Sequence, residues 1–151
     1  MDVVPFRIWP PVALGLPLAV GVAVTGVWGD PVTLPAAAGP LGWLLLLGFA
    51  CWNGWSLWLF RQHRTGLLPG QPTTGLVERG PFALSRNPLY LGLVVLYVAI
   101  ALLAPSVWAL CLLPVGVVAL EWGAIRPEER YLRARLGSAY DDYAGRVRRW
   151  L

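Results

Sequence analysis

The sequence contains no lysine, and it has few charged residues of any kind. All 12 basic residues are arginine, and charged residues make up 13% of the 151 positions, against roughly 25% in soluble domains. Hydrophobic residues make up 57% of the chain, and its mean hydropathy is +0.60. A soluble domain of this composition would expose large apolar patches to water. The composition therefore predicts an integral membrane protein.

Cysteine and histidine are also scarce. The two cysteines, Cys51 and Cys111, lie inside apolar runs, and His63 is the single histidine. The sequence has neither a CxxC motif nor a Cys/His cluster, so it predicts no metal site. The arginines flank apolar runs instead of alternating with stacking aromatics in a basic patch, which argues against nucleic-acid binding.

Four apolar runs predict the fold class. They cover residues 9–28, 41–60, 88–104 and 107–125, and only the last contains a charged residue, Glu121. A helix of about 20 residues crosses the hydrocarbon core of a bilayer, and the third run is slightly shorter than that. We expect a single all-α membrane domain, residues 1–151, with about four transmembrane helices.

The arginines predict the orientation in the membrane. The connections 29–40 and 105–106 contain none, whereas the loop 61–87 contains four and the tail 126–151 contains seven. By the positive-inside rule, that loop, the tail and both termini face the cytoplasm. We therefore expect a protein of the cell (inner) membrane with its charged segments on the cytoplasmic side.

The tail has the pattern of amphipathic helices. Apolar residues recur at helical spacing against a face of Arg, Asp and Glu. Pro127 suits the first turn of a helix, and Gly137-Ser138 suits a break followed by a new helix start. We expect two short interfacial helices lying on the membrane surface. The apolar stripe comprises Leu132, Leu136, Tyr140, Tyr143 and Val147.

The loop 61–87 is the segment most suggestive of function. It is rich in Gly, Pro and Thr, and loops of this length are usually functional or disordered. At its end, Asn87-Pro88 allows a purely structural interpretation, because Asn is a good N-cap and Pro a good first helical residue. The spacing alone does not decide between a cap and a ligand-binding residue.

Two ordered motifs in this half of the chain resemble a known family. The first is Gly-Pro-Phe-Ala-Leu-Ser-Arg-Asn-Pro-Leu-Tyr-Leu-Gly at 80–92, and the second begins with Glu128-Glu129 and continues through the tail to Trp150. Together they resemble the isoprenylcysteine carboxyl methyltransferase and phospholipid methyltransferase superfamily, in a bacterial-type Arg-Asn-Pro variant. The resemblance covers about residues 60–151.

The resemblance implies a cofactor, S-adenosylmethionine, and a pocket at the cytoplasmic face. Glu128 is implied to bind the cofactor's amino group or ribose, and Arg86 could pair with its carboxylate. Aromatic faces such as that of Tyr90 favour a cation. The full set of implied cofactor-binding residues is Leu76, Val77, Phe82, Arg86, Asn87, Pro88, Leu89, Tyr90 and Glu128.

Two departures from the prenylcysteine enzymes bear on the substrate. Asn87 stands where they have histidine, and asparagine does not titrate near neutral pH, so a general base there is not expected. Ala124 stands roughly where those enzymes have a substrate-binding arginine, and Arg126 is close by in the sequence. We take Glu121 and Arg126 as candidate catalytic residues. An ion pair between them at the interface is the structural alternative.

These motifs favour a methyltransferase acting on a lipidic or amphipathic substrate that enters from the bilayer. The acceptor can be a carboxylate, a thiol or an amine, and only the amine must lose a proton. Two alternatives stay open: a membrane reductase that uses NADPH, which shares a similar motif, and a non-catalytic membrane scaffold.

Overall fold

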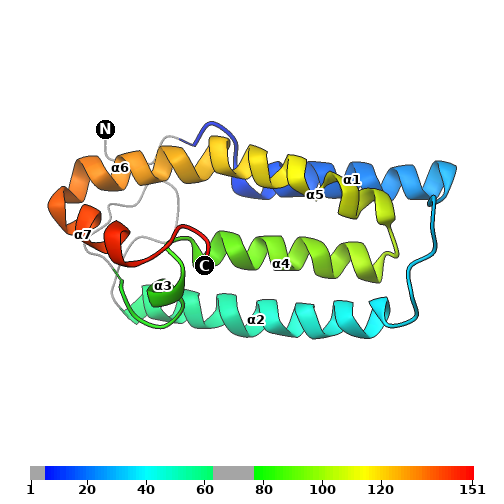
Figure 1. The fold of residues 1–151 in the computed structure, drawn as a ribbon, viewed down its shortest axis with the longest axis horizontal. Helices are drawn as coiled ribbons and strands as arrows, with labels where there is room; N and C mark the ends of the chain where they lie inside the picture. The colour runs from blue at the N-terminus through cyan, green and yellow to red at the C-terminus, as the bar shows by residue number, and fades with distance from the viewer. Residues whose placement is uncertain (1–5, 63–76) are drawn as a thin grey trace.

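The computed structural model describes residues 6–62 and 77–151, and regular secondary structure in these ranges is entirely helical (Figure 1). A π-helical turn at Glu121–Ile125 joins two of the helices. The helices are α1 (Pro10–Trp28), α2 (Ala38–Gln62), α3 (Pro81–Leu84), α4 (Pro88–Leu103), α5 (Val107–Leu120), α6 (Arg126–Leu136) and α7 (Ser138–Arg146).

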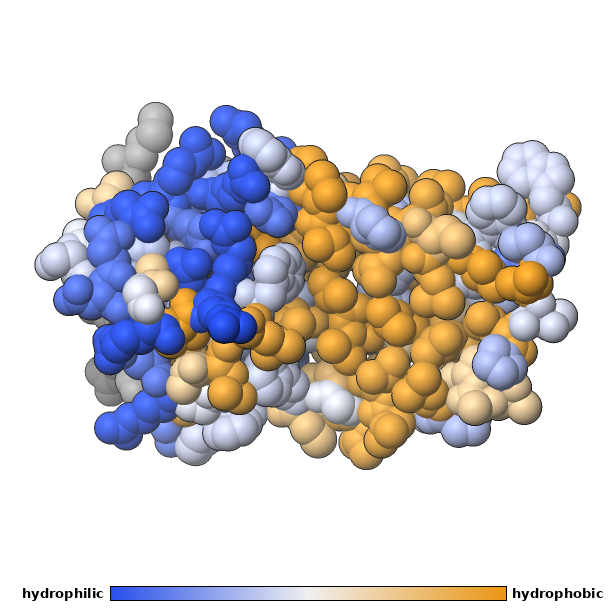
Figure 2. Space-filling model, in the orientation of Figure 1, coloured by the Kyte–Doolittle hydropathy of each residue, from blue (hydrophilic) through white to orange (hydrophobic). Residues whose placement is uncertain are grey.

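Three helical segments are long and apolar enough to cross a membrane: α1, α2 and the continuous stretch Val107–Leu136. The fourth apolar helix, α4, has 16 residues and is about 24 Å long at 1.5 Å per residue. Each of the four apolar runs in the sequence is thus helical, and the chain is an all-α integral membrane protein. Figure 2 shows a broad hydrophobic surface over this bundle and a hydrophilic surface at the end that carries α6 and α7.

The bundle is built from two closely packed helix pairs. α1 packs along α5, α2 packs along α4, and α4 lies between α2 and the α1–α5 pair (Figure 1). Small residues at the contacts let the backbones approach, as is common between membrane helices. A Cβ added at Gly21 of α1 would collide with the backbone of Ala109 in α5, and one at Gly92 of α4 would collide with the side chain of Asn53 in α2.

The close approach at Gly21 predicts a stability effect. Gly21→Ala is expected to lower the free energy of unfolding by about 1–3 kcal/mol, because the added methyl group forces the two helices apart. The matched control is Gly26→Ala on the same helix, where a Cβ would meet open space. Unfolding in mixed detergent micelles measures both, and equal stabilities for the two variants would contradict this packing.

Pro127 lies in the first turn of α6, as expected, but α6 is not a separate surface helix, because it continues from α5 through the π-helical turn. Proline has no N–H to donate to the carbonyl four residues earlier, and the chain passes this position through the π-helical turn. The carbonyl of Gly123 accepts hydrogen bonds from the N–H groups of Arg7 (2.9 Å) and Ile8 (3.2 Å) instead. Pro127 therefore leaves an acceptor to which the N-terminal segment binds.

The expected break in the tail is confirmed at Gly137. This residue has φ +56°, a left-handed conformation that glycine adopts without strain, and it separates α6 from α7. Tyr140 and Tyr143 of the predicted apolar stripe are buried. The two amphipathic helices thus turn this stripe toward the rest of the protein.

The two ends of the bundle differ in charge. The described arginines lie before α1, at the end of α2, before α4 and beyond α5, which all meet at one end (Figure 1). At the opposite end, a carboxylate oxygen of Asp30 accepts from Thr25 Oγ1 (3.0 Å) and from the backbone N–H groups of Val107 and Trp108. Asp30 therefore stabilises the N-terminus of α5.

Candidate functional site

The candidate site lies where the start of α4 meets α6 and the C-terminal segment. The hydroxyl of Tyr90, in the first turn of α4, donates to Glu128 Oε2 of α6 at 2.6 Å. Both side chains are half-buried. Two residues that the resemblance implies for the cofactor are therefore in direct contact, although 38 positions separate them in the sequence.

Asn87 occupies the N-cap position of α4, but its side chain makes no capping hydrogen bond. Its Nδ2 instead donates to the carbonyl of Arg149 at 3.1 Å, and its backbone N–H donates to Ser85 Oγ at 3.1 Å. Ser85 Oγ donates to the same Arg149 carbonyl, and the Arg86 N–H donates to the carbonyl of Arg148. Asn87-Pro88 therefore does start α4, as the structural interpretation has it, but the Asn87 amide binds the C-terminal segment instead of capping the helix.

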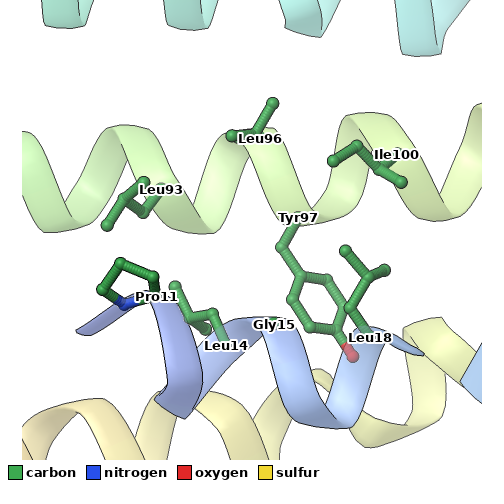
Figure 3. Close-up of a pocket in the computed structure, with 8 residues that line it drawn as sticks. All are labelled: Pro11, Leu14, Gly15, Leu18, Leu93, Leu96, Tyr97 and Ile100. Atoms are coloured by element: carbon green, nitrogen blue, oxygen red, sulfur yellow. The ribbon is translucent and has the colours of Figure 1, made fainter. Parts of the chain in front are cut away.

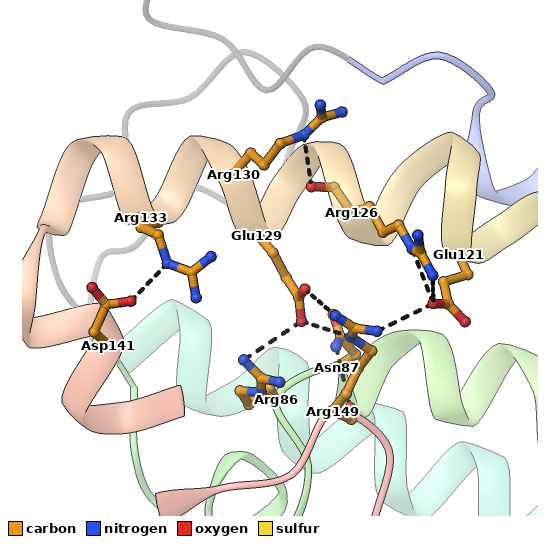
Figure 4. A network of polar contacts seen from close by, with 9 residues as sticks. All are labelled: Arg86, Asn87, Glu121, Arg126, Glu129, Arg130, Arg133, Asp141 and Arg149. Atoms are coloured by element: carbon orange, nitrogen blue, oxygen red, sulfur yellow. Dashed lines mark hydrogen bonds and ion pairs between the residues drawn. The ribbon is translucent and has the colours of Figure 1, made fainter. Parts of the chain in front are cut away.

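A network of ion pairs surrounds this junction (Figure 4). Arg149 donates to both carboxylate oxygens of Glu129, at 3.0 and 2.7 Å, and to Glu121 Oε1 at 3.1 Å. Arg86 Nη1 lies 3.6 Å from Glu129 Oε1. Glu129 is 8% exposed, so its charge requires such partners. The network joins α6, the C-terminal segment and the loop before α4.

The two candidate catalytic residues also lie in this network. Arg126 binds Glu121 Oε1 through Nε (3.1 Å) and Nη2 (2.9 Å), and its guanidinium lies 3.8 Å from the ring centroid of Trp122. The ion pair that we considered as the structural alternative is therefore present. The side chain of Arg126 is 41% exposed, so it can also contact a molecule at the surface.

Val77 and Phe82 belong to a neighbouring apolar cluster. They are buried with Leu59 of α2, and the ring of Phe82 meets that of Phe60 with centroids 4.7 Å apart. The Tyr143 hydroxyl donates a hydrogen bond to the Phe82 carbonyl oxygen at 2.7 Å, so this contact fixes α3 against α7.

Three residues of the implied cofactor-binding set remain, and they differ in their surroundings. Pro88 is buried as the first residue of α4, and its carbonyl accepts the indole N–H of Trp52 at 2.8 Å. Leu89 is half-buried in the first turn of α4. Leu76 lies outside the described residues.

Sequence reasoning did not single out Glu129, Tyr143 and Arg149 as site residues. Each lies in the tail motif, so a signal was present, but their partners are distant in the sequence. The hydrogen bonds to Glu129 raise the pKa of Arg149, and burial raises the pKa of Tyr143. Both groups therefore keep their protons throughout the physiological range.

The site contains a buried donor that has no partner among the described residues. No group of three or more His, Cys, Asp or Glu side chains that could hold a metal is found among the described residues. In the same ranges, Arg86 Nε is buried and has no hydrogen-bond partner. A buried donor without a partner is costly unless something binds it, and a carboxylate is a suitable acceptor.

The family model for phospholipid methyltransferase matches residues 38–139, about two thirds of the chain. The chain belongs to this family. The match runs from the first residue of α2 to the start of α7 and contains every predicted site residue. Phospholipid methyltransferases use S-adenosylmethionine as the methyl donor, so this chain is a membrane methyltransferase that depends on it. No significant match is found among curated proteins or among solved structures.

Proposed function

We propose that this methyltransferase modifies a lipidic or amphipathic acceptor at the cytoplasmic face of the cell membrane. The observation that carries the proposal is the contact of Tyr90 with Glu128 at the arginine-rich end of an apolar bundle. A polar site at that level meets water-soluble molecules on one side and lipid headgroups on the other.

The residues at the junction fit the groups of S-adenosylmethionine. The cofactor supplies a methyl group on a positively charged sulfur, which is already a good leaving group. Glu128 would bind the cationic amino group, and the ring of Tyr90 would face positive charge. The unpartnered Nε of Arg86 would donate to the carboxylate. Asn87 would add a hydrogen bond from its amide.

Glu121 and Arg126 would act on the acceptor side. Arg126 could bind an anionic headgroup while stacked on Trp122, because a guanidinium recognises phosphate and carboxylate well. Glu121 could bind a cationic headgroup or take the proton that an amine acceptor must lose. Holding acceptor and methyl donor in line at the junction would supply much of the rate enhancement.

The orientation follows from the charge distribution. The positive-inside rule would put the arginine-rich end, the loop 61–87 and both termini in the cytoplasm. The cofactor would then enter from the cytoplasm, and the acceptor would enter laterally from the bilayer.

The proposal is tested by incubating the purified full chain with methyl-labelled S-adenosylmethionine and a membrane lipid extract. We expect the label to enter the organic-solvent fraction, and mass spectrometry of that fraction identifies the acceptor. The Glu128→Gln variant serves as the control and should transfer little label. Label that enters only water-soluble products would contradict a lipidic acceptor.

A further inference from the structure

An apolar cavity of about 190 Å³, partly open to the outer surface of the bundle, lies between α1 and α4 (Figure 3). Its volume is similar to that of cavities, about 150 Å³, that bind small hydrocarbons in protein interiors. It is smaller than pockets for drug-sized ligands, which begin at about 300 Å³. The lining residues are Pro11, Leu14, Gly15, Leu18, Leu93, Leu96, Tyr97 and Ile100.

The lining offers no free hydrogen-bonding side chain. Tyr97 is its one polar side chain, and the Tyr97 hydroxyl donates to the carbonyl of Ala109 at 2.7 Å. A polar occupant would therefore lose its hydrogen bonds with water and gain none. The cavity suits hydrocarbon alone.

The cavity continues the face of α4 that carries the candidate site. Leu93 and Tyr97 follow Tyr90 by three and seven residues, so all three side chains lie on one side of the helix. Tyr97 is buried in the apolar core, and Tyr90 and Leu93 are partly buried residues packed against it. From Tyr90 to Ile100 the helix rises about 15 Å, so an alkyl chain whose headgroup lies at the polar junction is long enough to reach the cavity.

We propose that this cavity binds one alkyl chain of the methyl acceptor while the acceptor's headgroup lies at Glu121 and Arg126. The inference rests on the proposed function, because it assigns the acceptor an apolar tail. The cavity's volume fits part of one chain, so the second chain of a two-chain lipid would stay in the bilayer.

Gly15 permits a variant that fills the cavity without disturbing the helix packing. A Cβ at Gly15 would meet nothing within 4 Å, although this residue lines the cavity. Gly15→Leu therefore fills space that an alkyl chain would use. Gly26→Leu is the matched control, because Gly26 is also open, lies on α1 and is outside the cavity.

The occupant is tested with monoacyl phosphatidylethanolamine that carries a diazirine near the end of its chain, in nanodiscs of phosphatidylcholine. We expect cross-links to the cavity segments of α1 and α4 in the wild type and in Gly26→Leu, and at least tenfold fewer in Gly15→Leu. Cross-links spread evenly over the outer bundle surface, or equal yields in the two variants, would show that the probe contacts the protein only as bulk lipid. Either result would overturn the proposal.

Methyl transfer gives a second measurement with the acceptor identified from the lipid extract. Gly15→Leu should lower kcat/KM for the long-chain acceptor roughly tenfold or more. It should leave kcat/KM nearly unchanged for an analogue of the acceptor in which an acetyl group replaces the long chain. Affinity for S-adenosylmethionine should stay at the wild-type value, which shows that the variant is folded. If the wild type transfers methyl groups and Gly15→Leu is equally active on both acceptors, the cavity assignment fails while the methyltransferase proposal stands.

Discussion

Glu128→Gln is expected to weaken the binding of S-adenosylmethionine roughly 10- to 100-fold, the equivalent of one charge-assisted hydrogen bond. The substitution keeps the shape of the side chain and an acceptor for Tyr90, but it removes the negative charge that would pair with the cofactor's amino group. Tyr90→Ala should lower the affinity at least as much, because it removes both the aromatic face and the hydroxyl that orients Glu128. Isothermal titration measures each affinity.

A surface carboxylate provides the control for these variants. Asp142 is exposed on α7, so Asp142→Asn removes one negative charge and should leave the cofactor affinity unchanged. The thermal unfolding midpoints of Glu128→Gln and Asp142→Asn should stay close to that of the wild type, whereas Tyr90→Ala should lower it, because Tyr90 packs against the apolar core. Wild-type affinity in both Glu128→Gln and Tyr90→Ala would remove these residues from the cofactor site.

Arg149→Ala is expected to destabilise the protein by about 2 kcal/mol. The variant leaves the buried carboxylate of Glu129 without its two-point partner and removes one of the two guanidinium groups at Glu121. We place the effect below that of a fully buried pair because the Arg149 side chain is 34% exposed. For a chain of this size the midpoint should fall by roughly 4–8 °C.

Arg148 is the matched control for Arg149. It is the preceding residue in the same segment, its side chain is exposed, and it binds Arg86 through its backbone carbonyl, which alanine retains. Arg148→Ala should therefore change the unfolding midpoint little. Equal midpoints for the two arginine variants would show that the ion-pair network does not fix the C-terminal segment.

The helices were predictable because their signals are local. Each apolar run needs only its own residues to be recognised, and the helices found there begin within three residues of the runs at 9, 41, 88 and 107. The continuity of α5 with α6 was not predictable in this way. Pro127 is favoured in the first turn of a helix and disfavoured inside one, which suggests a new helix, and the N-terminal segment that uses the freed Gly123 carbonyl is more than 100 residues away.

The site was predictable only in part, for a related reason. Resemblance to the family identified Tyr90 and Glu128 separately, but no local pattern indicates that the two side chains touch. The roles of Asn87 and Arg149 depend on a C-terminal segment that returns to the start of α4. Such long-range pairing is set by the packing of α6 and α7. The same limitation hid Asp30, whose carboxylate binds the start of a helix 77 residues later.

The most direct test of the account is titration of the purified full chain with S-adenosylmethionine and, separately, with NADPH. The account predicts saturable binding of S-adenosylmethionine that is weakened in Glu128→Gln, and no binding of NADPH. Binding of NADPH without binding of S-adenosylmethionine would contradict it and favour a membrane reductase.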